Sequence, residues 1–119
     1  IIEQQVGAKV FNACGNYNIN QSAYLVKNAL GIITPDTGLM HIAAAFDKNI
    51  IAVWGNTVPQ FGMYPYRAVN AKGKTYNFEV KNLHCRPCSK LGYAECPKKH
   101  FRCMLGQDTD KIAEIANEW

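Results

Sequence analysis

The sequence has no long apolar run; its longest uninterrupted apolar stretches are residues 42–46 and 50–54. A membrane-spanning helix needs roughly 18 or more such residues, so the sequence predicts none. Residues 1–5 have neither a basic start nor a long apolar stretch, and we expect no signal peptide there. Because the chain begins with isoleucine, we expect it to be a piece of a longer protein.

Charged residues are scarce at 18% of the chain, whereas apolar residues make up 48%. This balance is typical of a folded domain and argues against intrinsic disorder. The length of 119 residues is enough for one domain with a buried core. Repeats and low-complexity segments are absent from the sequence.

The first half of the chain alternates strand-like and helix-like apolar segments. The expected order is a strand at 9–13, a helix at 20–29 capped by Asn18 or Asn20, a strand at 31–34, a helix at 39–46 and a strand at 50–54. Such uniformly apolar strands between helices indicate a parallel sheet buried on both faces, with βαβαβ connections. The fold class is therefore α/β, a Rossmann-like parallel sheet with flanking helices. A further strand at 76–80 and an amphipathic helix at 108–119 are expected in the second half.

The most informative stretch is 34–41, Thr-Pro-Asp-Thr-Gly-Leu-Met-His, which joins a predicted strand to a predicted helix. In open parallel sheets ligands bind beyond the carboxyl ends of the strands, and the start of a helix offers unpaired N–H groups to a phosphate. Thr37 can donate its hydroxyl, Gly38 lets an anion approach the backbone, and His41 lies one turn into the helix. The sequence therefore predicts a phosphate or pyrophosphate site at this turn.

A purely local interpretation of the same stretch stays open. Asp36 would then cap the helix, Pro35 would stiffen the turn, and His41 would be an ordinary surface histidine. The stretch 34–41 lacks the Gly-Lys-Ser/Thr end of a Walker loop and the three spaced glycines of a dinucleotide fingerprint, so enzymes with those motifs are disfavoured.

Residues 81–105 form an expected basic, cysteine-rich loop. Between residues 81 and 104 there are six basic residues and one acidic residue, a net charge of +5. Such a patch suggests an anionic neighbour, with a solvated loop surface as the alternative. The loop holds four of the five cysteines, Cys85, Cys88, Cys96 and Cys103. Four thiolates can bind zinc tetrahedrally, but only the first pair has zinc-site spacing, so free buried thiols or a disulfide stay open.

Three blocks of sequence carry a family resemblance. Residues 33–45, residues 51–57 (Ile-Ala-Val-Trp-Gly-Asn-Thr) and Cys85-Arg86-Pro87-Cys88 with the later cysteines resemble family 9 glycosyltransferases, the ADP-heptose:lipopolysaccharide heptosyltransferases. The resemblance covers roughly residues 13–105 in the family's order. It implies a GT-B enzyme with two Rossmann-like domains, in which residues 1–119 are one partial domain, the C-terminal one that binds the nucleotide-sugar.

The resemblance also implies an inverting transfer of heptose from ADP-heptose to the inner core of lipopolysaccharide, without a required metal cofactor. By position, the resemblance implies that Asp36, Thr37, Gly38, Leu39 and His41 bind the donor sugar and diphosphate. The turn at Gly15 and Asn16 occupies the place where such domains often meet the nucleoside. The catalytic base of the family is an acidic residue of the N-terminal domain, so we expect no catalytic residue here and an inactive isolated chain.

The expected partners are thus a nucleotide-sugar such as ADP-heptose, the lipopolysaccharide acceptor at the inner membrane surface and the N-terminal domain. The expected location is cytoplasmic, with peripheral attachment to the inner membrane as an option. Two alternatives stay open: a zinc-stabilised module that binds an anionic partner, and a relative that keeps the fold without catalysis. Nucleic acid is disfavoured as that partner, because the basic residues do not interleave with exposed aromatic residues on one element.

Overall fold

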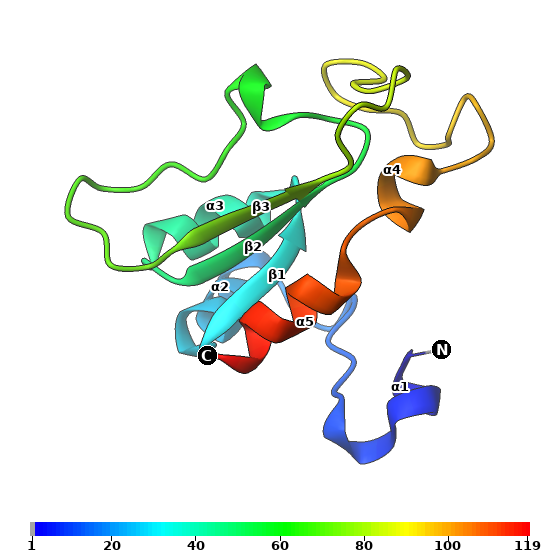
Figure 1. Cartoon of the computed structure of the whole chain (residues 1–119). Helices are drawn as coiled ribbons and strands as arrows, with labels where there is room; N and C mark the ends of the chain where they lie inside the picture. The colour runs from blue at the N-terminus through cyan, green and yellow to red at the C-terminus, as the bar shows by residue number, and fades with distance from the viewer. Residues whose placement is uncertain (1) are drawn as a thin grey trace.

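The fold is built on one small parallel sheet. The computed structural model describes residues 2–119. Strands β1 (Gly31–Pro35), β2 (Asn49–Trp54) and β3 (Thr75–Glu79) lie side by side in that order, all parallel (Figure 1). In the register, Ile32 lies opposite Ile50, and Ile51 lies opposite Tyr76. The predicted α/β architecture with a parallel sheet is confirmed.

The main core lies on the face of the sheet covered by α2 (Ile19–Asn28) and α3 (Gly38–Ala45). The sequence starts α2 with a capping box, in which the side chain of Asn18 accepts from the Gln21 amide and the Gln21 side chain accepts from the Asn18 amide. The buried side chains of this core are contributed by the two helices and by β2: Val26, Met40, Ala43, Ala44, Ile50, Ala52 and Trp54.

The C-terminal helix α5 (Thr109–Asn117) ends against the opposite face of the sheet (Figure 1). Ile32 packs on the α3 side, so the neighbouring Gly31 points to the other side, because strand residues alternate. A Cβ atom at Gly31 would clash with the ring of Trp119, which follows α5. Asp108 caps α5 by accepting from the Lys111 amide.

The expected strand at 9–13 is wrong. The N-terminal segment instead forms α1 (Ile2–Val6) and the 3-10 turn η1 (Gly7–Lys9), and residues 10–13 are irregular. The side-chain oxygen of Asn12 accepts a hydrogen bond from the Cys14 backbone amide, and the backbone carbonyl of Asn12 accepts one from the Asn16 side chain. These local hydrogen bonds compete with sheet pairing, and Phe11 is left exposed.

The expected burial of the strands on both faces is wrong for β1. Thr34 is its single buried residue, and Ile33 is 53% exposed. β1 is an edge strand in this sheet, and Trp119 covers it at Gly31. β2, the central strand, is buried over most of its length, as expected.

Residues 55–74 connect β2 to β3 without an α-helix, through the 3-10 turn η2 (Pro59–Phe61). The cysteine-rich loop follows β3 and ends in the short helix α4 (Arg102–Leu105). Neither short helix has a periodic apolar pattern that would have predicted it. Within residues 2–119, no helix has the length and apolar character needed to cross a bilayer.

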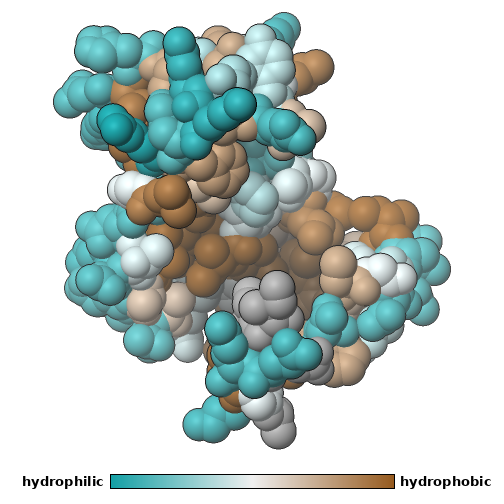
Figure 2. Space-filling view, turned by 90° about the vertical axis from the view of Figure 1, so that its right-hand side faces the viewer, coloured by the Kyte–Doolittle hydropathy of each residue, from teal (hydrophilic) through white to brown (hydrophobic). Residues whose placement is uncertain are grey.

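The three strands point toward the side on which the cysteine-rich loop lies (Figure 1). Viewed from that side, the surface is hollowed and its walls are apolar (Figure 2). Leu91 of the cysteine-rich loop and Leu105, the last residue of α4, are among the exposed large apolar residues. The carboxyl edge of the sheet therefore lies on a recessed, partly apolar side of the molecule.

Candidate functional site

The candidate site is the turn between β1 and α3. Thr37 is the N-cap residue of α3 and has extended backbone angles, φ −143° and ψ 166°. The Thr34 hydroxyl donates to the carbonyl of Pro35 at 2.9 Å, so the Thr37 hydroxyl donates to Thr34 at 3.0 Å. The Thr37 side chain is thus turned away from the helix start, and among the described residues no side chain caps α3.

Gly38, the first residue of α3, leaves space beside the uncapped amides. Apart from its two chain neighbours and the backbone of α3 itself, no described atom lies within 4 Å of the place that a Cβ atom would take there. The helix offers the positive end of its dipole and its free N–H groups at this point. The turn therefore has the features of an anion site, and the binding of a phosphate there stays a prediction.

Asp36 is fixed beside these amides by the neighbouring strand. Its Oδ2 accepts a hydrogen bond of 3.1 Å from Oγ1 of Thr57, which is 5% exposed and lies just beyond β2. Asp36 lines a cavity of about 210 Å³ formed by the ends of β1 and β2 and by the cysteine-rich segment. The other lining residues are Pro35, Val53, Gly55, Asn56, Thr57, Leu91, Tyr93, Ala94, Phe101 and Met104.

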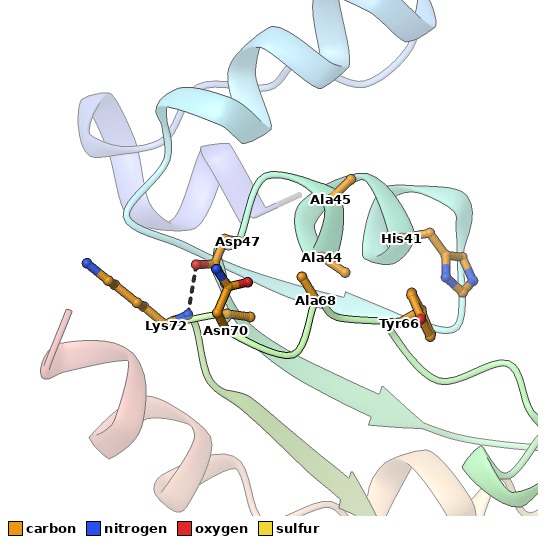
Figure 3. A pocket seen from close by; sticks show the side chains of 9 residues that line it. His41, Ala44, Ala45, Asp47, Tyr66, Ala68, Asn70 and Lys72 are labelled. Carbon is orange, nitrogen blue, oxygen red and sulfur yellow. Dashed lines mark hydrogen bonds between the residues drawn. The ribbon is translucent and has the colours of Figure 1, made fainter.

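His41 lines a different cavity, of about 620 Å³, along the flank of α3 (Figure 3). Its ring lies next to Tyr66 at one end of this cavity, and Asp47 and Lys72 close the other end through a 2.8 Å bond from the Lys72 amide. The structure therefore brings Asp36, Thr37 and Gly38 together but gives His41 a separate cavity. A role for His41 in donor binding stays a prediction.

The turn at Gly15 and Asn16 is present, with Gly15 at φ +74° and the Asn16 side chain donating to the Asn12 carbonyl. Neither residue lines the cavity of Asp36 or that of His41. Because residues 9–13 form no strand, this turn does not follow a strand of the sheet. Its place beside a nucleoside stays a prediction.

Arg86 is a residue of this region that sequence reasoning missed. Its side chain, 6% exposed, pairs with Glu79 at 3.0 Å and donates to the carbonyl oxygens of Gly55, Thr57 and Val80. The guanidinium thereby joins the turn after β2 to the end of β3. No local pattern could identify it, because its partners lie up to 31 residues away.

The four loop cysteines line one cavity of about 550 Å³, together with His100 and other residues of the loop. Sγ of Cys85 lies 3.6 Å from Nε2 of His100, and the Cys88 thiol donates to the Cys85 carbonyl at 3.3 Å. Burial, with a contribution from the neighbouring thiols, raises the pKa of Cys88. The Phe101 amide, at 3.4 Å from Sγ, is the main cause that lowers the pKa of Cys96.

All five cysteines are free thiols, so the disulfide alternative finds no support in the structure. In the part of the chain that the structure describes, no three His, Cys, Asp or Glu side chains are arranged to hold a metal ion. The sequence thus correctly gathers four cysteines in one loop, while a metal there stays a prediction.

The sequence model of glycosyltransferase family 9 (heptosyltransferase) matches residues 2–94. The chain belongs to glycosyltransferase family 9. It is 30% identical to the lipooligosaccharide heptosyltransferase 2 of Campylobacter jejuni over 117 residues, which is 98% of this chain and 33% of the relative. It is 44% identical to the lipooligosaccharide heptosyltransferase 2 of Haemophilus influenzae over 50 residues, 42% of this chain and 14% of the relative.

A third relative, the lipopolysaccharide heptosyltransferase 2 of Salmonella typhimurium, is 37% identical over 59 residues, 50% of this chain and 16% of the relative. The family 9 chain therefore spans at most about a third of the length of these relatives. No solved structure matches it.

Proposed function

We propose that this chain is the donor-binding part of a GT-B heptosyltransferase and that it binds the diphosphate of ADP-heptose at the start of α3. The observation that carries the proposal is the uncapped helix start, with Thr37 turned away and Gly38 open. The family membership and the names of the relatives support a nucleotide-sugar donor and a lipopolysaccharide acceptor. The transfer would invert the anomeric centre and take place at the inner face of the membrane.

The geometry suits the chemistry of the leaving group. As the glycosidic bond breaks, ADP gains negative charge on the phosphate oxygens. Fixed N–H donors of Gly38 and Leu39 at a helix start stabilise this charge more in the transition state than in the ground state. The Asp36 carboxylate can accept hydrogen bonds from sugar hydroxyls, so it suits the sugar end of the donor.

The catalytic base would come from another domain of the protein. It would lie across the cleft from the start of α3, where it can deprotonate the acceptor hydroxyl. No part of this account assigns a catalytic residue to the 119 residues of this chain.

Calorimetric titration of the full-length protein with ADP-heptose, ADP and UDP tests the proposal. We expect saturable binding of ADP-heptose and ADP. Because the helix-start amides take any diphosphate, UDP measures how much affinity the adenosine adds. The absence of ADP-heptose and ADP binding to a folded full-length protein would refute the proposal.

The cysteine-rich loop supports a second, structural proposal, a zinc ion held by Cys85, Cys88, Cys96 and Cys103. The supporting observation is that all four thiols line one cavity in a segment with little regular structure. A zinc-bound thiolate has no proton, so Cys88 would have to release the Cys85 carbonyl when it binds the metal. Zinc would then close a loop that has little core of its own.

Metal analysis of the purified full-length protein tests this second proposal. About one zinc ion per chain is expected, and Cys88→Ser should lose it. Cys14→Ser is the matched control, because Cys14 is exposed and lies outside the loop. A protein purified without chelators that carries no zinc and takes up none on addition would contradict the proposal.

A further inference from the structure

Arg86 lies where the carboxyl ends of the strands meet. Its Nε donates to the carbonyl of Gly55, and one Nη donates to the carbonyl of Thr57 at 2.9 Å. The same guanidinium holds the carboxylate of Glu79, at the end of β3. Arg86 therefore fixes both sides of the turn 55–57 against the neighbouring strand.

The turn that Arg86 fixes also fixes Asp36. The backbone carbonyl of Thr57 accepts a hydrogen bond from Arg86, and its hydroxyl donates one to Asp36. The bond to Thr57 engages Oδ2 of Asp36 and leaves the second carboxylate oxygen able to accept a hydrogen bond from a ligand hydroxyl. A continuous set of hydrogen bonds thus runs from the cysteine-rich loop through Thr57 to the candidate site.

The opposite edge of the sheet carries a similar arginine. Arg67 bonds Asp47 and the carbonyl oxygens of Lys48 and Lys74, which precede β2 and β3. Arg67 therefore joins the amino ends of the same two strands that Arg86 joins at their carboxyl ends. It has no bond to the turn between β1 and α3, which makes it a matched control.

We propose that Arg86 is a positioning residue of the donor site, which sets Asp36 against the sugar of the donor through the turn at Thr57. This inference rests on the proposed donor site. Lysine at this position would keep the positive charge but lack the planar array of donors that spans Gly55, Thr57 and Glu79. The turn would then be free to move, and Asp36 would lose its fixed orientation.

The experiment measures the affinity of the full-length protein for ADP-heptose and for ADP by calorimetry. We expect Arg86→Lys to weaken ADP-heptose binding about tenfold and ADP binding far less, because ADP lacks the sugar that Asp36 would meet. Thr57→Val should have the same selective effect. The double variant Arg86→Lys/Thr57→Val should bind ADP-heptose about as well as the single variant with the lower affinity, because both changes interrupt the same set of hydrogen bonds.

Arg67→Lys controls for general destabilisation. It should lower the melting temperature as Arg86→Lys does, yet leave the affinities for both ligands at their wild-type values. If Arg86→Lys does not fold, Glu79→Gln is the second variant. It removes the charge that holds the Arg86 guanidinium against the turn and replaces no residue of the turn itself, so a smaller loss with the same selectivity for ADP-heptose is expected.

Three results would overturn the inference: unchanged ADP-heptose affinity in a folded Arg86 or Glu79 variant, equal losses for ADP-heptose and ADP, or additive losses in the double variant. Failure of the proposed function is a separate result, because the wild-type protein would then bind neither ADP-heptose nor ADP.

Discussion

At the scale of single residues, the start of α3 is a turn held by side-chain hydrogen bonds, and no described side chain caps the helix amides. Thr34 and Thr37 bond to one another, and Thr57 holds Asp36, so the turn keeps its shape without a side chain on the helix amides. The sequence predicts this turn because a strand, Asp-Thr-Gly and a helix follow one another directly along the chain. It could not predict Thr57 or Arg86, because their bonds cross from other strands.

Gly38 is the residue that separates folding from ligand binding. Its Cβ position is open, so Gly38→Ala should fold normally and be as stable as the wild type or up to about 1 kcal/mol more stable. The added methyl group would occupy the space through which a phosphate approaches the amides, and affinity for ADP should fall. Chemical denaturation and calorimetry measure the two effects, and a variant that binds ADP as tightly as the wild type would contradict the assignment.

Asp47 gives a pH-dependent prediction. Hydrogen bonds from the backbone amides of Lys72 and Gly73 hold its pKa below the usual value of 3.8. A carboxyl with a lowered pKa stabilises the fold above its unfolded pKa, and this contribution is lost as the pH falls through the folded pKa. Between about pH 5 and about pH 2 the wild type should lose more stability than Asp47→Asn, as measured by urea unfolding. Parallel pH curves would contradict this.

At the scale of elements, the sequence predicts well what local bonds decide. The bounds of α2 and α5 are close to those expected, because Asn18 and Asp108 supply local caps. The strand expected at 9–13 fails, because a strand exists only when another strand pairs with it. The prediction that β1 is buried on both faces fails for a related reason, because burial depends on which elements cover each face of the sheet.

The capping box of α2 allows a direct test of this local control. Asn18→Ala removes the acceptor of the Gln21 amide and should lower the free energy of unfolding by about 1 kcal/mol. Asn18→Gly should cost only a few tenths of a kcal/mol, because glycine also suits the N-cap position. Equal losses in the two variants, measured by chemical denaturation, would show that the loss does not come from the cap.

At the scale of the whole molecule, the chain spans about a third of the Campylobacter jejuni relative, and β1 is an edge strand whose Ile33 is exposed. The recessed side seen in Figure 2 lies at the carboxyl edge, where a GT-B partner domain would complete the cleft. The family and the general architecture follow from the sequence. The contacts among the cysteine-rich loop, the turn 55–57 and Asp36 come from the folded chain.

The isolated chain should not transfer sugar, because the proposed base belongs to another domain. With ADP-heptose and a lipopolysaccharide acceptor, the full-length protein should release ADP, whereas residues 1–119 alone should not. Coupled detection of ADP measures both. Turnover by the isolated chain would show that the base lies within these 119 residues.

Hydrogen exchange with and without ADP tests the central claim most directly. In the full-length protein, saturating ADP should slow the exchange of the amides between residues 36 and 41, where α3 begins, and should leave α2 unchanged. Saturating ADP that leaves the exchange at the start of α3 unchanged, or slows it equally in α2, would contradict a diphosphate site at that helix end.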